Sequence, residues 1–161
     1  MQKIHERLKE KFGSAVPATH DFRGDETAVI KKESLLEVLR FLKENPELDF
    51  NVLMDLSAVD YLPFGEARPR FEVVYHLYSL KHDHRLRIKV PVEEKDAHLS
   101  SATGLWPAAD WFEREVWDMF GIRFEGHPNL KRILMYEEFT GHPLRKDYPV
   151  NQRQPLIGPR N

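Results

Sequence analysis

The stretch WPAADWFEREVWDMFGIRFEGHPNLKRILM, residues 106–135, decides the fold. Apolar residues recur in it at i, i+4, i+8 and i+12, and these are Ala108, Phe112, Val116 and Phe120. This spacing predicts an amphipathic helix. Pro107 suits the first helical position, and Gly121 suits the left-handed residue that ends a helix. Trp111 and Trp117 widen the apolar face, so we expect Trp111, Phe112, Val116 and Phe120 to be mostly buried.

Two features follow the predicted helix. Residues 126–128 are Gly-His-Pro, a combination that favours a tight turn, because glycine permits a reversal and proline fixes φ. Apolar character then resumes at Leu130, Ile133, Leu134 and Met135, with Lys131 and Arg132 between them, and we expect residues 131–135 to form a strand that returns to the sheet. The turn has an echo at residues 141–143, again Gly-His-Pro, and each turn precedes a leucine and two basic residues. Both histidines are candidates for contacts with backbone carbonyls or with a partner.

Residue types at fixed spacing in this stretch match a family signature. They are Glu113, Arg114, Glu115, Asp118, Met119, Phe120, His127, Lys131, Arg132, Ile133 and Leu134. The chain thereby resembles the C subunit of proton-pumping NADH:quinone oxidoreductase, which is respiratory complex I. Residues 141–149 resemble the C-terminal motif of the same family. We therefore predict an interface made by Glu113, Arg114, Glu115, Asp118, Phe120, Gly121, His127, Pro128, Arg132, Gly141, His142, Pro143, Leu144, Arg145, Lys146, Asp147, Tyr148 and Pro149.

The resemblance implies a function within a larger complex. That complex transfers electrons from NADH through FMN and Fe–S clusters to quinone and couples the transfer to proton translocation. The implied role of this chain is structural, beside the D subunit of the quinone site and near ferredoxin-like subunits, on the cytoplasmic side of a bacterial inner membrane. FMN and the Fe–S clusters would belong to partner subunits, and no cofactor to this chain. Membrane-bound hydrogenases and related dehydrogenases use similar subunits, so an equivalent subunit of one of those is an alternative.

The composition agrees with a non-redox role. The chain has 161 residues, a net charge of −2 and no cysteine. Without cysteine it can form neither disulfides nor cysteine-ligated Fe–S clusters. It lacks the basic excess of a nucleic-acid binder, and we see no apolar run of membrane-spanning length and no secretory signal. Any membrane contact is therefore expected only through the complex.

Periodicity along the rest of the chain predicts an α+β fold. We expect helices over residues 4–12 and 33–44, and strands over 15–16, 27–30, 50–56, 71–80 and 85–92, with turn-rich residues at 20–26 and a loop at 60–70. The last two strands flank His82 and Asp83 and should form a hairpin. The prediction is a two-layer sandwich of a mixed β-sheet with helices on one side, over residues 1–136, plus an extended C-terminal arm over residues 137–161.

The arm differs in composition from the rest. Residues 141–161 hold four prolines and carry four basic residues against one acidic residue, a net charge of +3. Such a segment has too few apolar residues to fold alone. A frayed terminus is one interpretation, and a docking segment that orders on a partner is the other. On the second interpretation, deleting residues 141–161 would leave the stability of the isolated domain nearly unchanged.

A rival class is a free-standing metal-dependent hydrolase. Glu113, Glu115 and Asp118 are possible acid–base or metal groups, and His82 and His84 form an H-x-H pair. No histidine lies on nearby turns of the predicted helix, and no phosphate-binding glycine loop or local nucleophile motif is visible. We instead expect the carboxylates to form ion pairs. A buried Glu113 or Glu115 would need Arg114, Arg132 or a partner's cation, because an uncompensated buried carboxylate is costly.

Overall fold

The computed structural model describes residues 3–65 and 68–157. Its helices and strands, in chain order, are α1 Ile4–Phe12, β1 Ala18–Phe22, β2 Asp25–Val29, α2 Leu35–Glu44, β3 Val52–Asp60, β4 Phe71–Ser79, β5 His84–Val92, β6 His98–Ser100, α3 Ala109–Phe120 and β7 Arg123–Glu125. Short 3₁₀ turns lie at Gly13–Ala15, Lys32–Ser34, Leu62–Phe64 and Glu94–Asp96. The predicted α+β class is confirmed.

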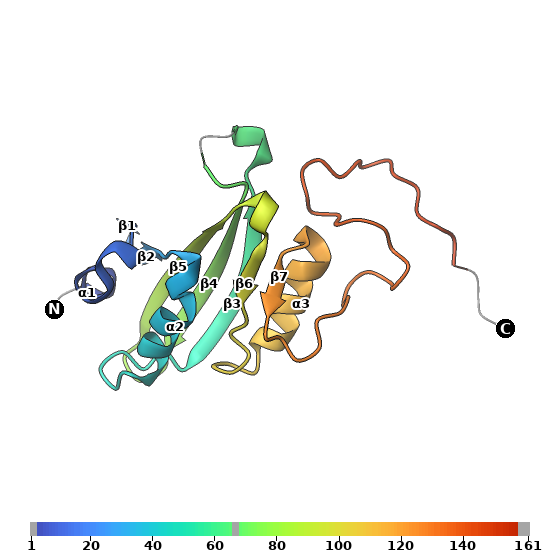
Figure 1. Cartoon of the computed structure of the whole chain (residues 1–161). Helices are drawn as coiled ribbons and strands as arrows, with labels where there is room; N and C mark the ends of the chain where they lie inside the picture. Colours follow the sequence, from blue (N-terminus) through green and yellow to red (C-terminus); the bar gives the residue numbers. More distant parts are fainter. Residues whose placement is uncertain (1–2, 66–67, 158–161) are drawn as a thin grey trace.

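The main sheet has five strands in the order β1-β2-β5-β4-β3. The β2–β5 pair is parallel and the other pairs are antiparallel, so the sheet is mixed. The predicted β4–β5 hairpin is present, and Asp83 in its turn has a φ of 50°. Helix α2 lies in front of this sheet, and α3 stands beside β3 together with β6 and β7 (Figure 1). The described helices thus gather on one side, as predicted.

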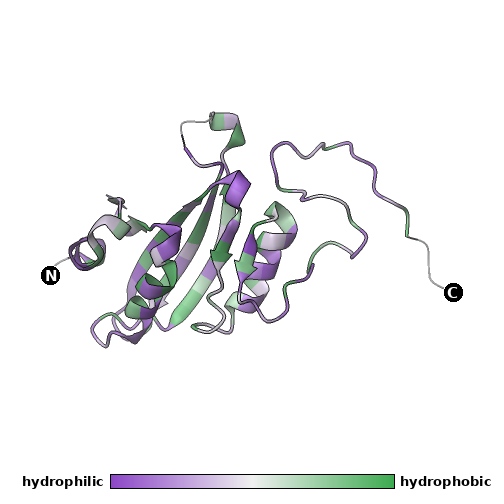
Figure 2. Cartoon of the chain, in the orientation of Figure 1, coloured by the Kyte–Doolittle hydropathy of each residue, from purple (hydrophilic) through white to green (hydrophobic). Residues whose placement is uncertain are grey.

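One hydrophobic core lies between the sheet and the helices. Strands β4 and β5 contribute alternate residues, such as Val73, Tyr75 and Ile88, and α2 contributes Val38 and Leu39. This alternation of hydrophobic and hydrophilic residues along strands and helices is visible in Figure 2. The opposite face of the sheet carries mostly polar and charged residues and is not covered by the helices.

The first predicted strand pair is misplaced in sequence. The first strand is β1, Ala18–Phe22, and not residues 15–16. The turn expected over residues 20–26 is reduced to Arg23 and Gly24, both with positive φ. Polar residues such as His20 and Asp21 are accepted in β1 because this strand lies at the edge of the sheet and is largely exposed.

The strand predicted over residues 131–135 is wrong. These residues form no strand, and the chain instead adds β7, Arg123–Glu125, which pairs in parallel with β6 in a separate two-stranded sheet. The physical reason is that the backbone N–H groups of Ile133, Leu134 and Met135 donate to the side chain of Asp118. A strand would need some of those donors for its ladder.

The predicted buried face of α3 is partly wrong. Val116 and Phe120 are buried, and Phe112 is only half-buried. Trp111 is 62% exposed, contrary to prediction. The buried row is Ala109, Glu113, Val116 and Phe120. A carboxylate thus occupies the position that hydrophobic spacing alone assigns to an aromatic residue.

Candidate functional site around the signature helix

The carboxylate of Asp118 is fully buried at the centre of the signature region. Its Oδ2 accepts hydrogen bonds from the backbone N–H groups of Ile133 (3.1 Å), Leu134 (2.9 Å) and Met135 (2.9 Å). Its Oδ1 pairs with the Arg132 guanidinium. Burial alone would raise the pKa of Asp118, but these N–H groups and Arg132 together lower it. Asp118 is therefore ionised and fixes the path of the chain after the turn.

Arg132 extends this cluster towards the C-terminal segment. Its Nη2 donates to the carbonyls of Phe139 (2.8 Å) and Gly141 (3.1 Å). The guanidinium also lies 5.8 Å from the ring centroid of Trp117 and 5.6 Å from that of Phe139. One side chain therefore connects α3 to residues 139–141.

Arg114 holds the same loop from the other side. It donates from Nε to the Lys131 carbonyl (3.1 Å) and from Nη2 to the Arg132 carbonyl (3.0 Å). Its guanidinium lies 5.1 Å from the ring centroid of Trp111. Arg114 and Asp118 therefore both act on backbone groups of the loop, and Arg114 forms no ion pair among the residues that the structure describes.

The C-terminal motif covers the end of α3. Three carbonyls of the last turn accept from it: Asp118 from His142 Nδ1 (3.0 Å), Met119 from the Leu144 N–H (3.1 Å) and Phe120 from Arg145 Nε (2.6 Å). Such carbonyls have no partner within their own helix, and a cation there also interacts favourably with the helix dipole. The motif is therefore a cap for the signature helix.

Gly121 is required at this junction. It ends α3 with a φ of 77°, as predicted from its position. A Cβ there would lie 2.6 Å from His142 Nε2 and 2.8 Å from Arg145 Nη2. Glycine thus permits both the left-handed turn and the close approach of the C-terminal motif.

The first Gly-His-Pro turn serves the other end of the helix. His127 Nε2 lies 3.1 Å from the Asp110 carbonyl, and His127 Nδ1 accepts from the Asn129 N–H (3.0 Å). Nε2 therefore carries the proton and donates to the carbonyl. The two echoed turns thus place one histidine at each end of α3, each bonded to a backbone carbonyl.

A second ionic cluster ties the C-terminal motif to the sheet. Asp60, at the end of β3, pairs with Arg70 (3.0 Å), and Arg70 also reaches Asp147 (2.6 Å). The Lys146 N–H donates to Asp60 Oδ2 (2.8 Å). Burial would raise the pKa of Asp60, but Arg70, the Lys146 N–H and the Leu62 N–H lower it. Sequence reasoning misses Asp60 and Arg70 because they lie in a segment predicted to be an exposed loop, far along the chain from Lys146 and Asp147.

Glu113 behaves differently from the prediction. Its carboxylate is fully buried, as the conditional prediction allows, yet no cation pairs with it among the described residues. It accepts from Ser101 Oγ and from the Ala102 N–H, each at 2.6 Å. Burial raises the pKa of Glu113 to about 7, although the two hydrogen bonds by themselves would lower it. Of the expected cations, Arg114 and Arg132 are bonded elsewhere. A carboxyl that is protonated, or bonded to neutral donors, avoids much of the cost of a buried charge.

The other predicted residues divide into packed and exposed groups. Tyr148 stacks on Phe139 at 6.0 Å between ring centroids, and a Cβ on Gly141 would lie 2.9 Å from the Tyr148 ring. Pro143 is half-buried. Exposed members of the predicted set are Glu115, Pro128, Leu144, Lys146, Asp147 and Pro149.

No catalytic constellation is visible in the described part of the chain. No group of three or more His, Asp or Glu residues there lies close enough to hold a metal ion. The H-x-H pair has ring centroids 5.8 Å apart, and His82 Nε2 lies 3.2 Å from the Pro46 carbonyl. Glu113, Glu115 and Asp118 do not converge, since two are buried in separate hydrogen-bond sets and Glu115 is exposed. Among the described helices, none has the length and apolar content to cross a membrane.

Comparison with known proteins identifies the family. Residues 28–154 match the model of the respiratory-chain NADH dehydrogenase 30 kDa subunit. The chain belongs to this family. It is 51% identical to the C subunit of NADH-quinone oxidoreductase from Citrifermentans bemidjiense over 154 residues, which cover 94% of this chain and 92% of the relative. The corresponding protein of Geobacter sulfurreducens is 44% identical, with 94% and 93% covered.

Solved structures agree with this family assignment. A trypsin-resistant fragment of Nqo5, residues 1–134, superposes with a TM-score of 0.70 and 35% identity, covering 80% of this chain and all of the fragment. A chain of the membrane-bound sulfane sulfur reductase, an archaeal respiratory membrane complex, gives a TM-score of 0.68 at 25% identity, covering 91% of this chain and 84% of that chain. The predicted family and fold class are confirmed, and the metal-dependent hydrolase is not favoured.

The Asp118 cluster should dominate the stability of the protein. We expect Asp118→Asn to lower the free energy of unfolding by about 3–5 kcal/mol, because it leaves Arg132 without its buried carboxylate. Urea unfolding at neutral pH measures this. Asp110→Asn is the matched control on the same helix and should cost less than about 1 kcal/mol, since the Asp110 carboxylate is partly exposed. Equal losses in the two variants would contradict the prediction.

Glu113 should make the stability depend on pH. The pKa of Glu113 is higher in the folded protein than in the unfolded chain. The stability that the protonated side chain contributes is therefore fully present below its pKa in the unfolded chain, and it is lost as the pH rises through about 7. We expect the wild type to lose about 2–3 kcal/mol relative to Glu113→Gln between about pH 5 and about pH 8. Urea unfolding of both proteins at several pH values gives this difference in the free energy of unfolding. The contributions of all other titrating groups are common to the two proteins and cancel in the difference. Parallel pH profiles would show that Glu113 titrates normally.

Proposed function

We propose that this chain is a non-catalytic structural subunit in the peripheral arm of NADH:quinone oxidoreductase. The observation that carries the proposal is how the signature residues are used. Arg114, Asp118 and Arg132 are engaged in bonds that hold the chain around α3, and do not line an open site. The residues of the signature therefore build a rigid body, which is the requirement for a subunit that positions others.

The proposed surroundings follow from the family. The chain would pack beside the D subunit of the quinone site and near ferredoxin-like subunits, on the cytoplasmic side of the bacterial inner membrane, and contact the membrane only through the complex. FMN and the Fe–S clusters would lie in partner subunits. The absence of cysteine in the sequence supports this for the clusters, since thiolates are their usual ligands.

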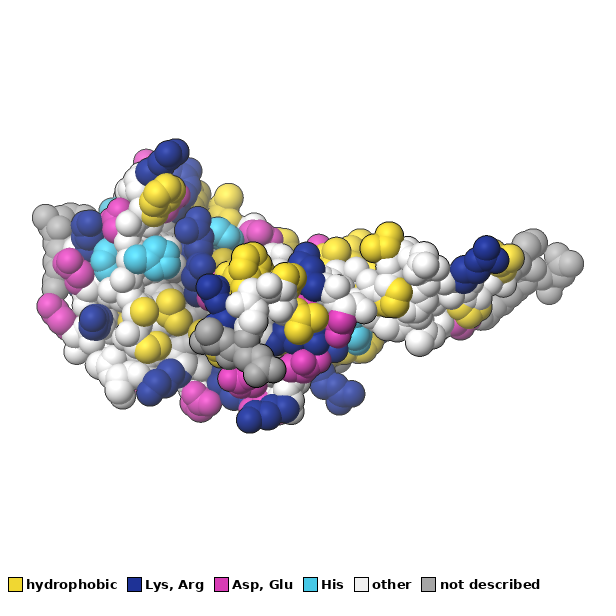
Figure 3. Space-filling model, turned by 90° about the horizontal axis from the view of Figure 1, so that it is seen from above, with side chains coloured by type: hydrophobic (Ala, Val, Ile, Leu, Met, Phe, Trp, Pro, Cys, Tyr) yellow, Lys and Arg dark blue, Asp and Glu magenta, His cyan; other side chains and the backbone are white. Residues whose placement is uncertain are grey.

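The C-terminal segment divides into two parts. Residues 141–148 bond to α3 and to Asp60, which speaks against the expectation that all of residues 141–161 are independent of the domain. Residues 149–157 continue beyond this motif along the edge of the molecule, and their one basic residue is Arg153 (Figures 1 and 3). Gln154 bonds to Thr140 and Tyr148, and the Pro155 carbonyl accepts from the Tyr136 hydroxyl. Val150 and Leu156 there are fully exposed. We propose this second part as the docking arm, because exposed apolar anchors beside Arg153 suit a segment that orders further on a partner.

Three relatives bear on the alternative complexes. The sulfane sulfur reductase chain has a similar fold, so the fold alone is compatible with an electron donor other than NADH. Sequence identities of 44% and 51% to subunits of NADH-quinone oxidoreductase support the NADH-linked complex over the alternative.

Two truncations separate capping from docking. Removing residues 149–161 should leave the thermal midpoint unchanged but abolish recovery with partner subunits. Removing residues 141–161 should also destabilise the domain, by about 2–4 kcal/mol, because buried carbonyls of α3 lose their donors. The measurements are thermal melts and pull-downs on both truncations. An intact pull-down of the shorter deletion would remove the docking role, and an unchanged melt of the longer one would remove the capping role.

The assembly role has a direct test. An affinity-tagged chain expressed in its own host should recover, from solubilised membranes, a complex with NADH–quinone reductase activity, flavin and Fe–S absorbance. The same chain purified alone should be colourless. A stoichiometric flavin or cluster that stays with the isolated chain through gel filtration, or a tagged chain that recovers no other subunit, would overturn the proposal.

A further inference from the structure

The uncovered face of the main sheet carries a row of polar side chains. Strand register places Thr27, Arg87, His76 and Asp55 next to one another across β2, β5, β4 and β3. These side chains alternate with the core residues Leu86 and Leu77 and therefore point away from the core. This face lies opposite to α2.

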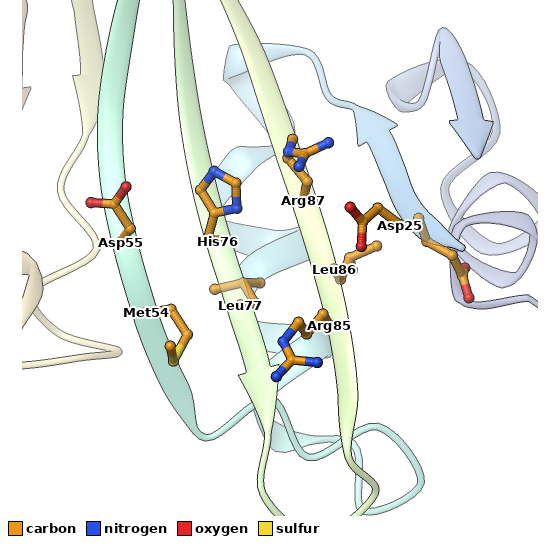
Figure 4. Close-up of a pocket in the computed structure, with 9 residues that line it drawn as sticks. Asp25, Met54, Asp55, His76, Leu77, Arg85, Leu86 and Arg87 are labelled. Atoms are coloured by element: carbon orange, nitrogen blue, oxygen red, sulfur yellow. The ribbon is translucent and has the colours of Figure 1, made fainter. Parts of the chain in front are cut away.

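The row borders a hollow of about 360 Å³ in the sheet face. Figure 4 shows Asp25, Arg87, His76 and Asp55 spread over four strands, with Arg85 and Met54 at the β-hairpin end. A register shift in β3 between Leu53 and Asp55 turns Met54 outward, and Met54 is 55% exposed. The floor is the sheet itself, so the hollow is wide and shaped for a protruding side chain.

The arginines of this hollow lack the ion pairs that the other ionic clusters have. Arg87 donates to Thr27 Oγ1 (3.3 Å), and Arg85 lies 5.0 Å from the Tyr78 ring centroid. Neither forms an ion pair with a carboxylate in residues 3–65 and 68–157. On the same strand and face, Lys89 pairs with Glu72 at 2.9 Å. Asp25, Glu26 and Asp55 also line the hollow, and Glu26 lies 2.8 Å from His5 Nδ1. Because Arg85 and Arg87 pair with none of these carboxylates, both guanidinium groups are open to a carboxylate from outside the chain.

The neighbouring residues favour a protein as the source of this carboxylate. Met54 lines the hollow and is 55% exposed. Methionine and arginine beside apolar surface are enriched at protein–protein interfaces. His76, between the arginines and Asp55, has a lowered pKa owing to burial and to Arg87, so it adds no positive charge at neutral pH.

We propose that the hollow bounded by Arg85, Arg87, His76 and Met54 is a docking site for an acidic side chain of another subunit of the complex. The carboxylate would lie between Arg85 and Arg87, and the apolar stem of its side chain would contact Met54. Basic residues on either side of it would face Asp25 and Asp55, which flank the arginines. This proposal rests on the proposed function, because it takes the partner from the same complex.

The natural absence of cysteine gives a clean test. Met54→Cys places a single thiol at the hollow in the full-length tagged chain. We expect a maleimide to label it about tenfold or more faster in the isolated chain than in the complex recovered from membranes. Equal labelling in the two states would overturn the proposal. Recovery of no complex by the wild-type chain would instead count against the proposed function.

Charge reversal tests the chemistry. The double variant Arg85→Glu/Arg87→Glu should lower recovery of partner subunits about tenfold or more, with an unchanged thermal midpoint. Arg40→Glu on the exposed side of α2 is the matched control and should behave as wild type. If the midpoint falls, Arg85→Gln/Arg87→Gln replaces the double variant under the same criterion. Wild-type recovery by the folded variant, or a stable dimer of the isolated Met54→Cys chain through this face, would overturn the proposal.

Discussion

The buried carboxylate of Asp118 is the constraint on which the second half of the molecule depends. A buried charge is tolerated only when its lone pairs are filled, and here three consecutive N–H groups and Arg132 fill them. Three consecutive donors reach one oxygen only if the backbone bends around it. Residues 133–135 therefore cannot form a strand, and the chain is directed along α3 to the C-terminal motif.

The same region also provides hydrogen-bond donors for the unpaired carbonyls at the C-terminal end of α3. A helix end offers carbonyls without intrahelical partners and a partial negative charge. Here the donors are His142, the Leu144 N–H and Arg145, which lie more than 20 residues later in the chain. The family's two separated motifs are thus two sides of one structure: the first provides the helix and the buried carboxylate, and the second provides the cap. Internal bonds account for Arg114, Asp118 and Arg132 of the first motif and for His142 and Arg145 of the second.

Local patterns predict the parts of the fold that depend on local physics. The spacing of leucines predicts α2, alternation predicts the β4–β5 hairpin, and the conformational freedom of Gly121 predicts the end of α3. The errors arise where distant residues decide. Nothing near residues 131–135 signals that Asp118 takes their donors, and nothing near Asp60 signals that Lys146 will lie beside it. The prediction for Trp111 fails because hydrophobicity does not show which of two adjacent faces meets the sheet.

Some charged side chains are paired within the chain, and others have no ion pair among the described residues. Arg70, Arg132 and Asp118 are satisfied within the chain, so they cannot be the main attraction for another subunit. Among the described residues, Arg85 and Arg87 on the sheet face form no ion pair, and Val150 and Leu156 expose apolar surface on the C-terminal segment, a separate part of the molecule. If the chain bound its partners at both places, formation of the second contact would be intramolecular. Two weak contacts would then give a higher overall affinity than either contact alone. The bonds of residues 141–148 to α3 and to Asp60 fix where the C-terminal segment begins relative to the sheet. On the proposed function, the internal bonds of the signature would aid assembly by fixing the point from which the arm starts.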